Sequence, residues 1–109
     1  MKHVLFELKG CSYELLNDLE FCKLALQISA SKSKSKLIDI IAHKFEPQGV
    51  TGLALLADSH ISIHTWPERR LAMCDIFTCG VDCDPIEAVQ YLRMQYKSTD
   101  TTFSHYIRE

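Results

Sequence analysis

The chain has 109 residues, of which 47% are hydrophobic and 24% are charged, and its formal net charge is −2. These values predict one globular domain over residues 1–109, and they exclude a disordered or fibrous protein. A slightly acidic chain has no basic field for phosphates, so we expect no nucleic-acid partner. No apolar run reaches the roughly 18 residues of a membrane span. Five cysteines without framework spacing favour free thiols, and we expect a cytoplasmic protein.

The N-terminal third of the chain predicts a strand followed by a helix. Residues 3–9, HVLFELK, have the composition of a strand. Over residues 12–29 the apolar side chains recur at mostly helical spacing, and Ser12 is a suitable N-terminal cap. The segment SASKSKSK at residues 29–36 is polar and repetitive, which indicates a solvated loop.

The middle of the chain predicts two hairpins. Residues 37–45 and 50–57 have the composition of strands and flank the turn EPQG, and the second is a nearly continuous apolar run that indicates a largely buried strand. Residues 60–66 and 71–78 form the next pair. They flank PERR, which has a common length for a hairpin connection.

The C-terminal part predicts a helix and a last strand. Asp84 is a suitable cap, Pro85 occupies the first helical position, and apolar residues then follow one face up to Tyr96. Residues 101–107 read as a short strand. The whole order of strand, helix, four strands, helix and strand predicts an α+β two-layer sandwich. In this fold class two helices pack on one face of a mostly antiparallel sheet.

The most unusual segment is ADSHISIHTWPE at residues 57–68. If the residues that flank the PERR turn pair with each other, Ser59 lies opposite Thr78 and beside Cys79. His64 follows Ser59 by five residues, and strict alternation along a strand places it on the opposite face. Either the backbone is irregular at Asp58 and Ser59, or the site is completed in another way, such as by a second subunit.

Three interpretations of this segment stay open on spacing alone. An irregular backbone at Ser59 would allow its hydroxyl to attack the carbonyl of the residue before it. The serine and the histidines could also be ordinary turn and strand residues. A zinc site is the third interpretation, with His60 and His64 on one strand face and Cys79 and Cys83 as further ligands.

Four segments together carry a resemblance to a known family. They are DSHISIHTWPE, the FTCG that ends at Gly80, the N-terminal HVLFELKGC and PQGVTG, and they span nearly the whole chain. In this combination they strongly resemble the short prokaryotic S-adenosylmethionine decarboxylase proenzymes, a pyruvoyl-dependent family. The usual pattern of that family is close to ESH(L/I)xIHTWPE followed by FTCG, so Asp58 stands here in the place of a glutamate.

The resemblance implies that the chain cleaves itself. In the family the serine hydroxyl attacks the carbonyl of the preceding residue, here Asp58, and elimination leaves a pyruvoyl group in the place of Ser59. A β chain of residues 1–58 and an α chain of residues 59–109 would remain associated. The pyruvoyl ketone would form a Schiff base with the substrate amine and accept electrons as carbon dioxide leaves.

The resemblance also implies roles for other residues. His64 would assist processing, and Thr51 would support it at a position where the family often has serine. Cys79 would return a proton to the product, which is a role that suits a thiol. Glu7 and Glu68 match acidic positions of the family and are expected to contact the substrate. Glu68 reads equally well as a turn residue, and Glu7 as an exposed strand residue.

The function implied by the resemblance is the decarboxylation of S-adenosylmethionine. The product would be the aminopropyl donor for spermidine synthesis, and the enzyme would be a homodimer of αβ units that needs no metal and no added coenzyme. Two alternatives remain within the same scaffold. One is a pyruvoyl-dependent decarboxylase of another amino acid, and the other is an inactive relative that binds and regulates a true decarboxylase.

Overall fold

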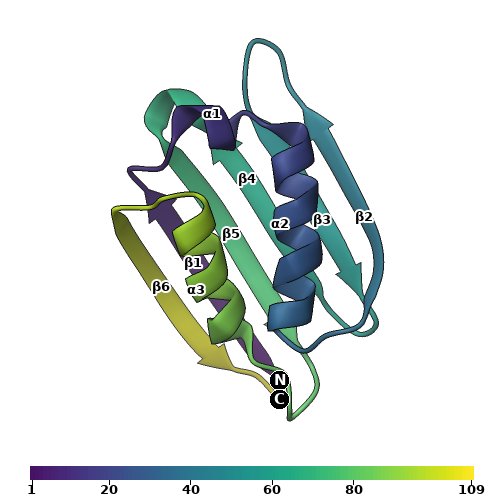
Figure 1. The fold of residues 1–109 in the computed structure, drawn as a ribbon. Helices are drawn as coiled ribbons and strands as arrows, with labels where there is room; N and C mark the ends of the chain where they lie inside the picture. The colour runs from purple at the N-terminus through teal and green to yellow at the C-terminus, as the bar shows by residue number, and fades with distance from the viewer.

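The structure is a computed structural model that describes all 109 residues. Six strands form one sheet in the order β2-β3-β4-β5-β1-β6 (Figure 1). The strands are β1 (Lys2–Lys9), β2 (Leu37–Lys44), β3 (Val50–Leu56), β4 (His60–Trp66), β5 (Leu71–Thr78) and β6 (Asp100–Ile107). The helices are α1 (Tyr13–Leu16), α2 (Leu19–Lys32) and α3 (Pro85–Gln95), and a 3-10 turn, η1 (Pro67–Arg69), joins β4 to β5.

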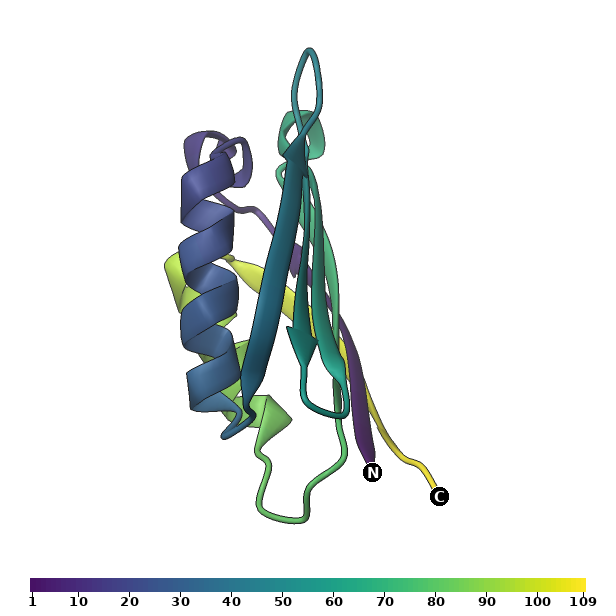
Figure 2. The same ribbon diagram turned by 90° about the vertical axis from the view of Figure 1, so that its right-hand side faces the viewer.

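The helices form one layer and the sheet forms the other, which confirms the predicted α+β two-layer architecture (Figure 2). All neighbouring strands run antiparallel. The face of the sheet away from the helices, here called the open face, carries no helix of this chain (Figure 2). None of the helices is long and apolar enough to span a membrane.

The prediction of one helix over residues 12–29 was wrong, because two helices occupy this region. Ser12 caps α1 as expected, since its side chain accepts a hydrogen bond from the Leu15 amide. Asp18 then starts α2 by accepting a hydrogen bond from the Phe21 amide. A short acidic side chain favours a new helix start over an uninterrupted helix.

The polar segment at residues 29–36 is also not simply a loop, because α2 continues to Lys32. Ser29 and Ala30 are buried, and so is Ser33 after the helix ends. Small serine and alanine side chains allow the helix to approach its neighbours here. Low-complexity composition therefore gave the wrong boundary, since the segment is packed on one side.

The second hairpin has the predicted register, with Trp66 opposite Leu71 and His60 opposite Phe77. Asp84 caps α3 by accepting a hydrogen bond from a backbone amide of the first turn. The strand predicted near the C-terminus is β6, and it lies beside β1 rather than beside its sequence neighbours.

The core lies between the helices and the sheet and is close-packed. Its largest fully buried side chains are Tyr96, Leu8, Leu16, Leu26, Leu56, Ile61, Ile63, Ile76 and Leu92. Helix α2 approaches β3 so closely that a Cβ atom on Gly52 would lie 2.6 Å from Sγ of Cys22. Only glycine permits this approach, because real Cβ contacts are longer.

The prediction that β3 is largely buried holds only for the face that the helices cover. Its side chains alternate, and Leu53 and Leu55 project from the open face with 43% and 52% of their surface exposed. Cross-strand pairing places further exposed apolar residues on that face: Leu5, Ile41, Trp66, Met73 and Tyr106. The apolar side chains of β3 thus lie alternately on the covered face and on the open face of the sheet.

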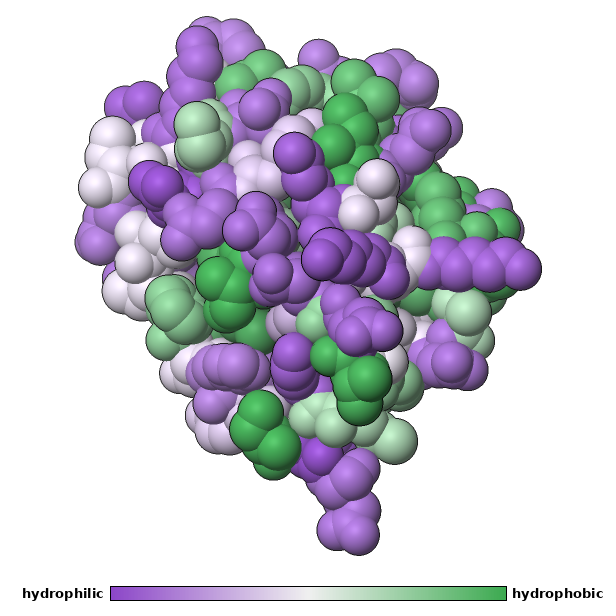
Figure 3. Space-filling view, turned by 60° about the horizontal axis from the view of Figure 1, so that its bottom comes forward, coloured by the Kyte–Doolittle hydropathy of each residue, from purple (hydrophilic) through white to green (hydrophobic).

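The surface at the lower end of the molecule differs from the open face. Figure 3 brings this end forward, and hydrophilic residues cover most of the view while hydrophobic residues form separate patches. Both termini and the connection between β3 and β4 lie at this end (Figure 1). Exposed apolar residues also occur away from the open face, for example Leu24, Val81 and Met94.

Candidate active site

Ser59 lies in the short connection between β3 and β4, at the lower end of Figure 1. The Leu56 amide donates to the carbonyl of Ser59 at 3.0 Å and keeps this connection tight. Cys79 follows β5 directly, and its thiol donates to the carbonyl oxygen of Asp58 at 3.0 Å. This is the carbonyl that precedes Ser59. The predicted approach of Cys79 to Ser59 is thus present, and the thiol polarises the peptide bond before the serine.

Ser59 borders two hollows. One lies on the open face, has a volume of about 750 Å³, and is lined by Ser59, His60, Ser62, Asp75, Phe77 and Arg108 among others. The other is smaller, about 120 Å³, and contains Cys79 and Cys83. A side chain at position 59 can therefore reach a substrate-sized space on one side and two thiols on the other.

His64 and Thr51 form a second group of predicted residues, at the upper end of the open face in Figure 1. They lie directly opposite each other on β4 and β3, and Oγ1 of Thr51 is 3.2 Å from Nδ1 of His64. Both line a hollow of about 330 Å³ together with Trp66, Glu68 and Phe45. The structure therefore brings Thr51, His64 and Glu68 together.

The two groups do not meet within one chain. His60 and His64 share the open face, and the four residue steps between them span about 13 Å at roughly 3.3 Å per residue. Ser59 precedes the strand, so its irregular position does not shorten the distance to His64. An irregular backbone at Ser59 therefore does not bring the two groups together within one chain.

Glu7 lies apart from the other acidic candidate. It projects from β1 opposite Met73, in a hollow that it shares with residues of β6. Its carboxylate is 3.7 Å from Nζ of Lys9, and both side chains are substantially exposed. Glu7 is therefore not joined to Glu68 within the chain.

The four residues of the hypothetical zinc site do not converge. His60 faces the open-face hollow, whereas Cys79 and Cys83 line the smaller hollow behind the connection. His64 lies farther away, at the other end of β4. The zinc interpretation of these four residues was therefore wrong.

The cysteines fall into two classes. Burial raises the pKa of Cys11 and of Cys22 to about 11 and raises the pKa of Cys74 well above its usual value. Cys79 and Cys83 are only partly buried, and all five cysteines are free thiols. The two partly buried thiols thus lie near Ser59, while the three buried ones belong to the core.

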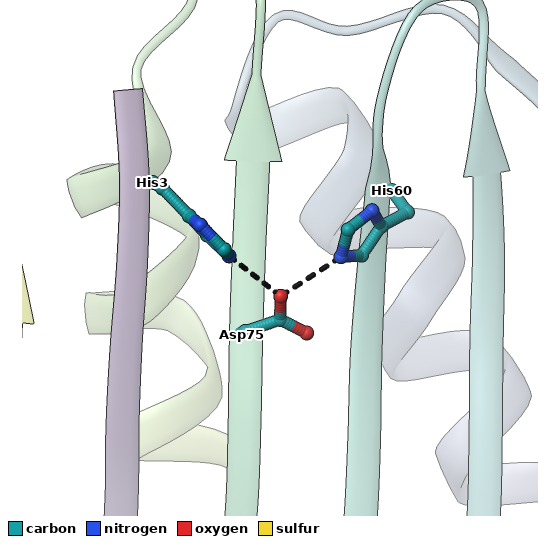
Figure 4. Close-up of side chains that lie close together, drawn as sticks. All are labelled: His3, His60 and Asp75. Atoms are coloured by element: carbon teal, nitrogen blue, oxygen red, sulfur yellow. Dashed lines mark hydrogen bonds and ion pairs between the residues drawn. The ribbon is translucent and has the colours of Figure 1, made fainter. Parts of the chain in front are cut away.

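One cluster was missed by sequence reasoning. Figure 4 shows His3 and His60 converging from either side on Asp75, and each Nε2 lies 2.8 Å from Oδ2 of that carboxylate. The hydroxyl of Ser62 donates to the other oxygen. No local pattern indicates this cluster, because it depends on β1 lying beside β5, and these strands are distant in the chain.

The carboxylate at the centre of this cluster is ionised. Burial alone would raise the pKa of Asp75, but the hydrogen bonds from Ser62, His3 and His60 outweigh burial and lower it below its ordinary value. A carboxylate that accepts several hydrogen bonds is stabilised in its charged form. Asp75 therefore carries a negative charge beside the Ser59 hollow.

Comparisons with known proteins agree with this geometry. Residues 2–109 match the family model described as S-adenosylmethionine decarboxylase. A protein of Synechococcus sp. named S-adenosylmethionine decarboxylase proenzyme is 45% identical and is aligned over 99% of this chain and 84% of its own length. One of the same name from Prochlorococcus marinus is 44% identical, with 99% and 86% covered. The crystal structure of the adenosylmethionine decarboxylase from Aquifex aeolicus has a TM-score of 0.87 at 32% identity, with 99% of this chain and 92% of that chain covered. The chain belongs to the S-adenosylmethionine decarboxylase family.

Proposed function

We propose that the chain is a proenzyme that cleaves itself between Asp58 and Ser59 and then decarboxylates S-adenosylmethionine. Its membership of a family whose relatives are named as such proenzymes supports the activity. The observation that carries the proposal is the thiol of Cys79 on the carbonyl oxygen of Asp58. This contact places a hydrogen-bond donor, Cys79, at the Asp58–Ser59 peptide bond. The hydroxyl that attacks this bond belongs to the next residue, Ser59.

Cleavage begins when Oγ of Ser59 attacks the carbonyl carbon of Asp58. A new C–O bond forms, the C–N bond breaks, and an ester replaces the peptide bond. The Cys79 thiol offsets the charge that develops on the carbonyl oxygen during the attack. Loss of the Ser59 α-proton then expels the carboxylate that ends residues 1–58. Hydrolysis of the remaining dehydroalanine releases ammonia and leaves a pyruvoyl group on residues 59–109.

The surroundings of residue 59 fit such a group, because the open-face hollow beside it is large enough for a substrate. The pyruvoyl group supplies an electrophilic ketone for the substrate amine and accepts the electron pair left behind by carbon dioxide. Cys79 lies on the other side of residue 59, with its thiol within hydrogen-bond distance of the Asp58 carbonyl. From there it returns a proton to the product.

The active unit in this proposal is a homodimer whose open faces pack together. Seven large apolar side chains are exposed on that face, which is the pattern of a surface that another surface covers. A two-fold axis that crosses the strands reverses the two ends, so the partner's His64 comes to lie at Ser59. His64 assists elimination in this arrangement, and Thr51 holds its ring through the 3.2 Å contact.

Substrate binding uses the hollow around His64. Trp66 and Phe45 offer aromatic faces for the adenine or the sulfonium, and the carboxylate of Glu68 can accept from ribose hydroxyls. Glu7 projects from the same open face and borders the substrate once two faces pack together. In the dimer this hollow and the Ser59 hollow form one continuous site.

The cellular setting follows from the same chemistry. Five free thiols suit a reducing compartment, and we propose the cytoplasm. The decarboxylated product is an aminopropyl donor and would supply spermidine synthesis.

Mass spectrometry of the purified protein under denaturing conditions tests the proposal. We expect two fragments, residues 1–58 and 59–109, with the second blocked to Edman degradation, together with release of carbon dioxide from S-adenosylmethionine. The variant Ser59→Ala should remain one chain and release none. An undivided wild-type chain after long incubation would contradict self-cleavage. Undiminished carbon dioxide release by Ser59→Ala would contradict the pyruvoyl chemistry.

A further inference from the structure

We infer that His60 is the base that takes the hydroxyl proton of Ser59 during self-cleavage, and that Asp75 and His3 hold it in the state required. This inference rests on the proposed self-cleavage and names a residue for a step that His64 and Cys79 leave open. In the proposed dimer the partner's His64 serves the later elimination, and the His64 of the same chain lies about 13 Å from His60 along the strand at roughly 3.3 Å per residue. Cys79 already donates its proton to the Asp58 carbonyl.

The hydrogen bonds of the cluster determine where its protons lie. Nη1 of Arg108 lies 3.3 Å from Nδ1 of His3, and a guanidinium only donates, so His3 accepts through Nδ1 and carries its proton on Nε2. That Nε2–H donates to Oδ2 of Asp75. His60 donates to the same oxygen through its own Nε2–H, and Ser62 donates to the other oxygen. Asp75 therefore fixes the proton of His60 on Nε2 and leaves Nδ1 as a proton acceptor.

The free nitrogen of His60 lies on the side of Ser59. In Figure 4 the second ring nitrogen of His60 is on the side nearer the connection between β3 and β4, which carries Ser59. His60 follows Ser59 in the chain, and both line the same hollow. The side chain of His60 is 38% exposed, whereas those of His3 and Asp75 are 19% and 18% exposed. The supporting residues are thus more buried than His60, which lines the hollow.

The proton balance of the step is complete with these groups. As Oγ of Ser59 bonds to the carbonyl carbon of Asp58, its proton moves to Nδ1 of His60. The negative charge of Asp75 stabilises the imidazolium that forms. When the C–N bond breaks, the same proton passes to the departing nitrogen of residue 59, which becomes an amine. His60 acts first as base and then as acid, and no other reactant is consumed.

A metal ion is the alternative for two histidines and a carboxylate, since their ligand atoms lie within 4.8 Å of one another. Metal binding through Nε2 would need the proton of His3 on Nδ1, where it would face the guanidinium of Arg108. The observed donor to His3 therefore favours the proton-transfer role, and the metal becomes an outcome of the test.

Cell-free synthesis with labelled methionine gives a direct measure of cleavage. Met1 labels residues 1–58, and Met73 and Met94 label residues 59–109, so precursor and both fragments are visible on a gel. His60→Gln keeps a side-chain amide that can donate to Asp75 but has no base at the position of Nδ1. We expect it to cleave about 100-fold more slowly than wild type or slower, and added imidazole to restore part of the rate.

The matched control is His105→Gln, which alters an exposed histidine of β6 and should cleave at the wild-type rate. Circular dichroism and thermal unfolding check that each variant folds. If His60→Gln does not fold, Asp75→Asn is measured instead, with an expected slowing of about tenfold or more because His60 loses its support.

Three results would overturn the inference. The first is cleavage of His60→Gln within about threefold of wild type. The second is that Asp58→Asn does not cleave while His60→Gln cleaves normally. This result would make the Asp58 carboxylate the base. The third is wild-type cleavage that a chelator stops and zinc restores. An uncleaved wild-type chain would instead contradict the proposed function, so the two failures are distinguishable.

Discussion

The two faces of the sheet are built from the same strands but serve different purposes. The covered face consists of interlocking apolar side chains, and helix α2 lies so close that Gly52 has no room for a Cβ atom. The open face mixes exposed leucines with histidines and acidic residues, among them His60, His64 and Asp75. Packing on the first face stabilises the chain, whereas the second face carries the groups that can do chemistry.

The open face itself has two ends that differ in chemistry. The lower end in Figure 1 has Ser59 and the ionised carboxylate of Asp75, with Cys79 behind the connection, and the upper end has His64 with Thr51. Each end holds part of what self-cleavage requires. Because the two groups lie at opposite ends of an apolar face, we expect a dimer. In that dimer each active site contains Ser59 of one chain and His64 of the other.

The largest effect is expected when Ser59 and His64 are removed from different chains, so that each chain keeps only one of them. A His64→Ala chain and a Ser59→Ala chain should each remain uncut when expressed alone. Together they can form mixed dimers in which one site has both Ser59 and His64, so the His64→Ala chain should be cut. Mass spectrometry of differently tagged chains measures this. Cleavage of His64→Ala in the absence of the other chain would show that no second subunit is needed.

A smaller effect is expected from placing a charge on the open face. Leu53→Asp would bury a carboxylate in the dimer interface twice, and the dissociation constant should rise about 100-fold or more. Analytical ultracentrifugation measures it. Leu24→Asp is the matched control, since Leu24 is 52% exposed and Leu53 is 43% exposed but only Leu53 lies on the open face. Equal dissociation constants for the two variants would place the interface elsewhere.

Overpacking the covered face should lower stability without a direct effect on the site. Gly52→Val places a side chain 2.6 Å from Sγ of Cys22 and 2.8 Å from Cδ1 of Leu26. We expect a loss of about 2–3 kcal/mol in the free energy of unfolding, with a melting temperature lowered by roughly 10 °C. The comparison is made in the uncut Ser59→Ala background. Leu24→Ala, on the solvent side of α2, should change stability by less than about 1 kcal/mol.

The smallest effect concerns the charge of Asp75 on the open face. Because its pKa is lowered in the folded chain, its carboxylate adds stability above the unfolded pKa of about 3.9, and this stability is lost as the pH falls through the folded pKa. Asp75→Asn should therefore be less stable than its parent at neutral pH, and the difference should shrink below about pH 4. Urea unfolding of uncut chains at several pH values measures it. If the difference in the free energy of unfolding did not change with pH, the pKa of Asp75 would not be lowered by folding.

Local signals were sufficient for most of the strands and for the end of the molecule that carries Ser59. The PERR turn sets the register of β4 and β5, and that register brings Cys79 to the carbonyl before Ser59. The prediction failed where packing overrides composition. Asp18 divides the first helix, and the serine-rich segment continues α2 because its small residues face the core.

The sequence by itself determined the strands, the cap of α3, the second hairpin and the residues of the family motif, because each depends on neighbours a few positions apart or on a quoted pattern. Only the tertiary structure decided that β1 lies between β5 and β6, and thereby that His3 and His60 share Asp75. It also decided that one face of β3 stays open. Strand order and the choice of covered face depend on contacts between distant parts of the chain, and apolar periodicity alone carries no information about which strand will be the neighbour.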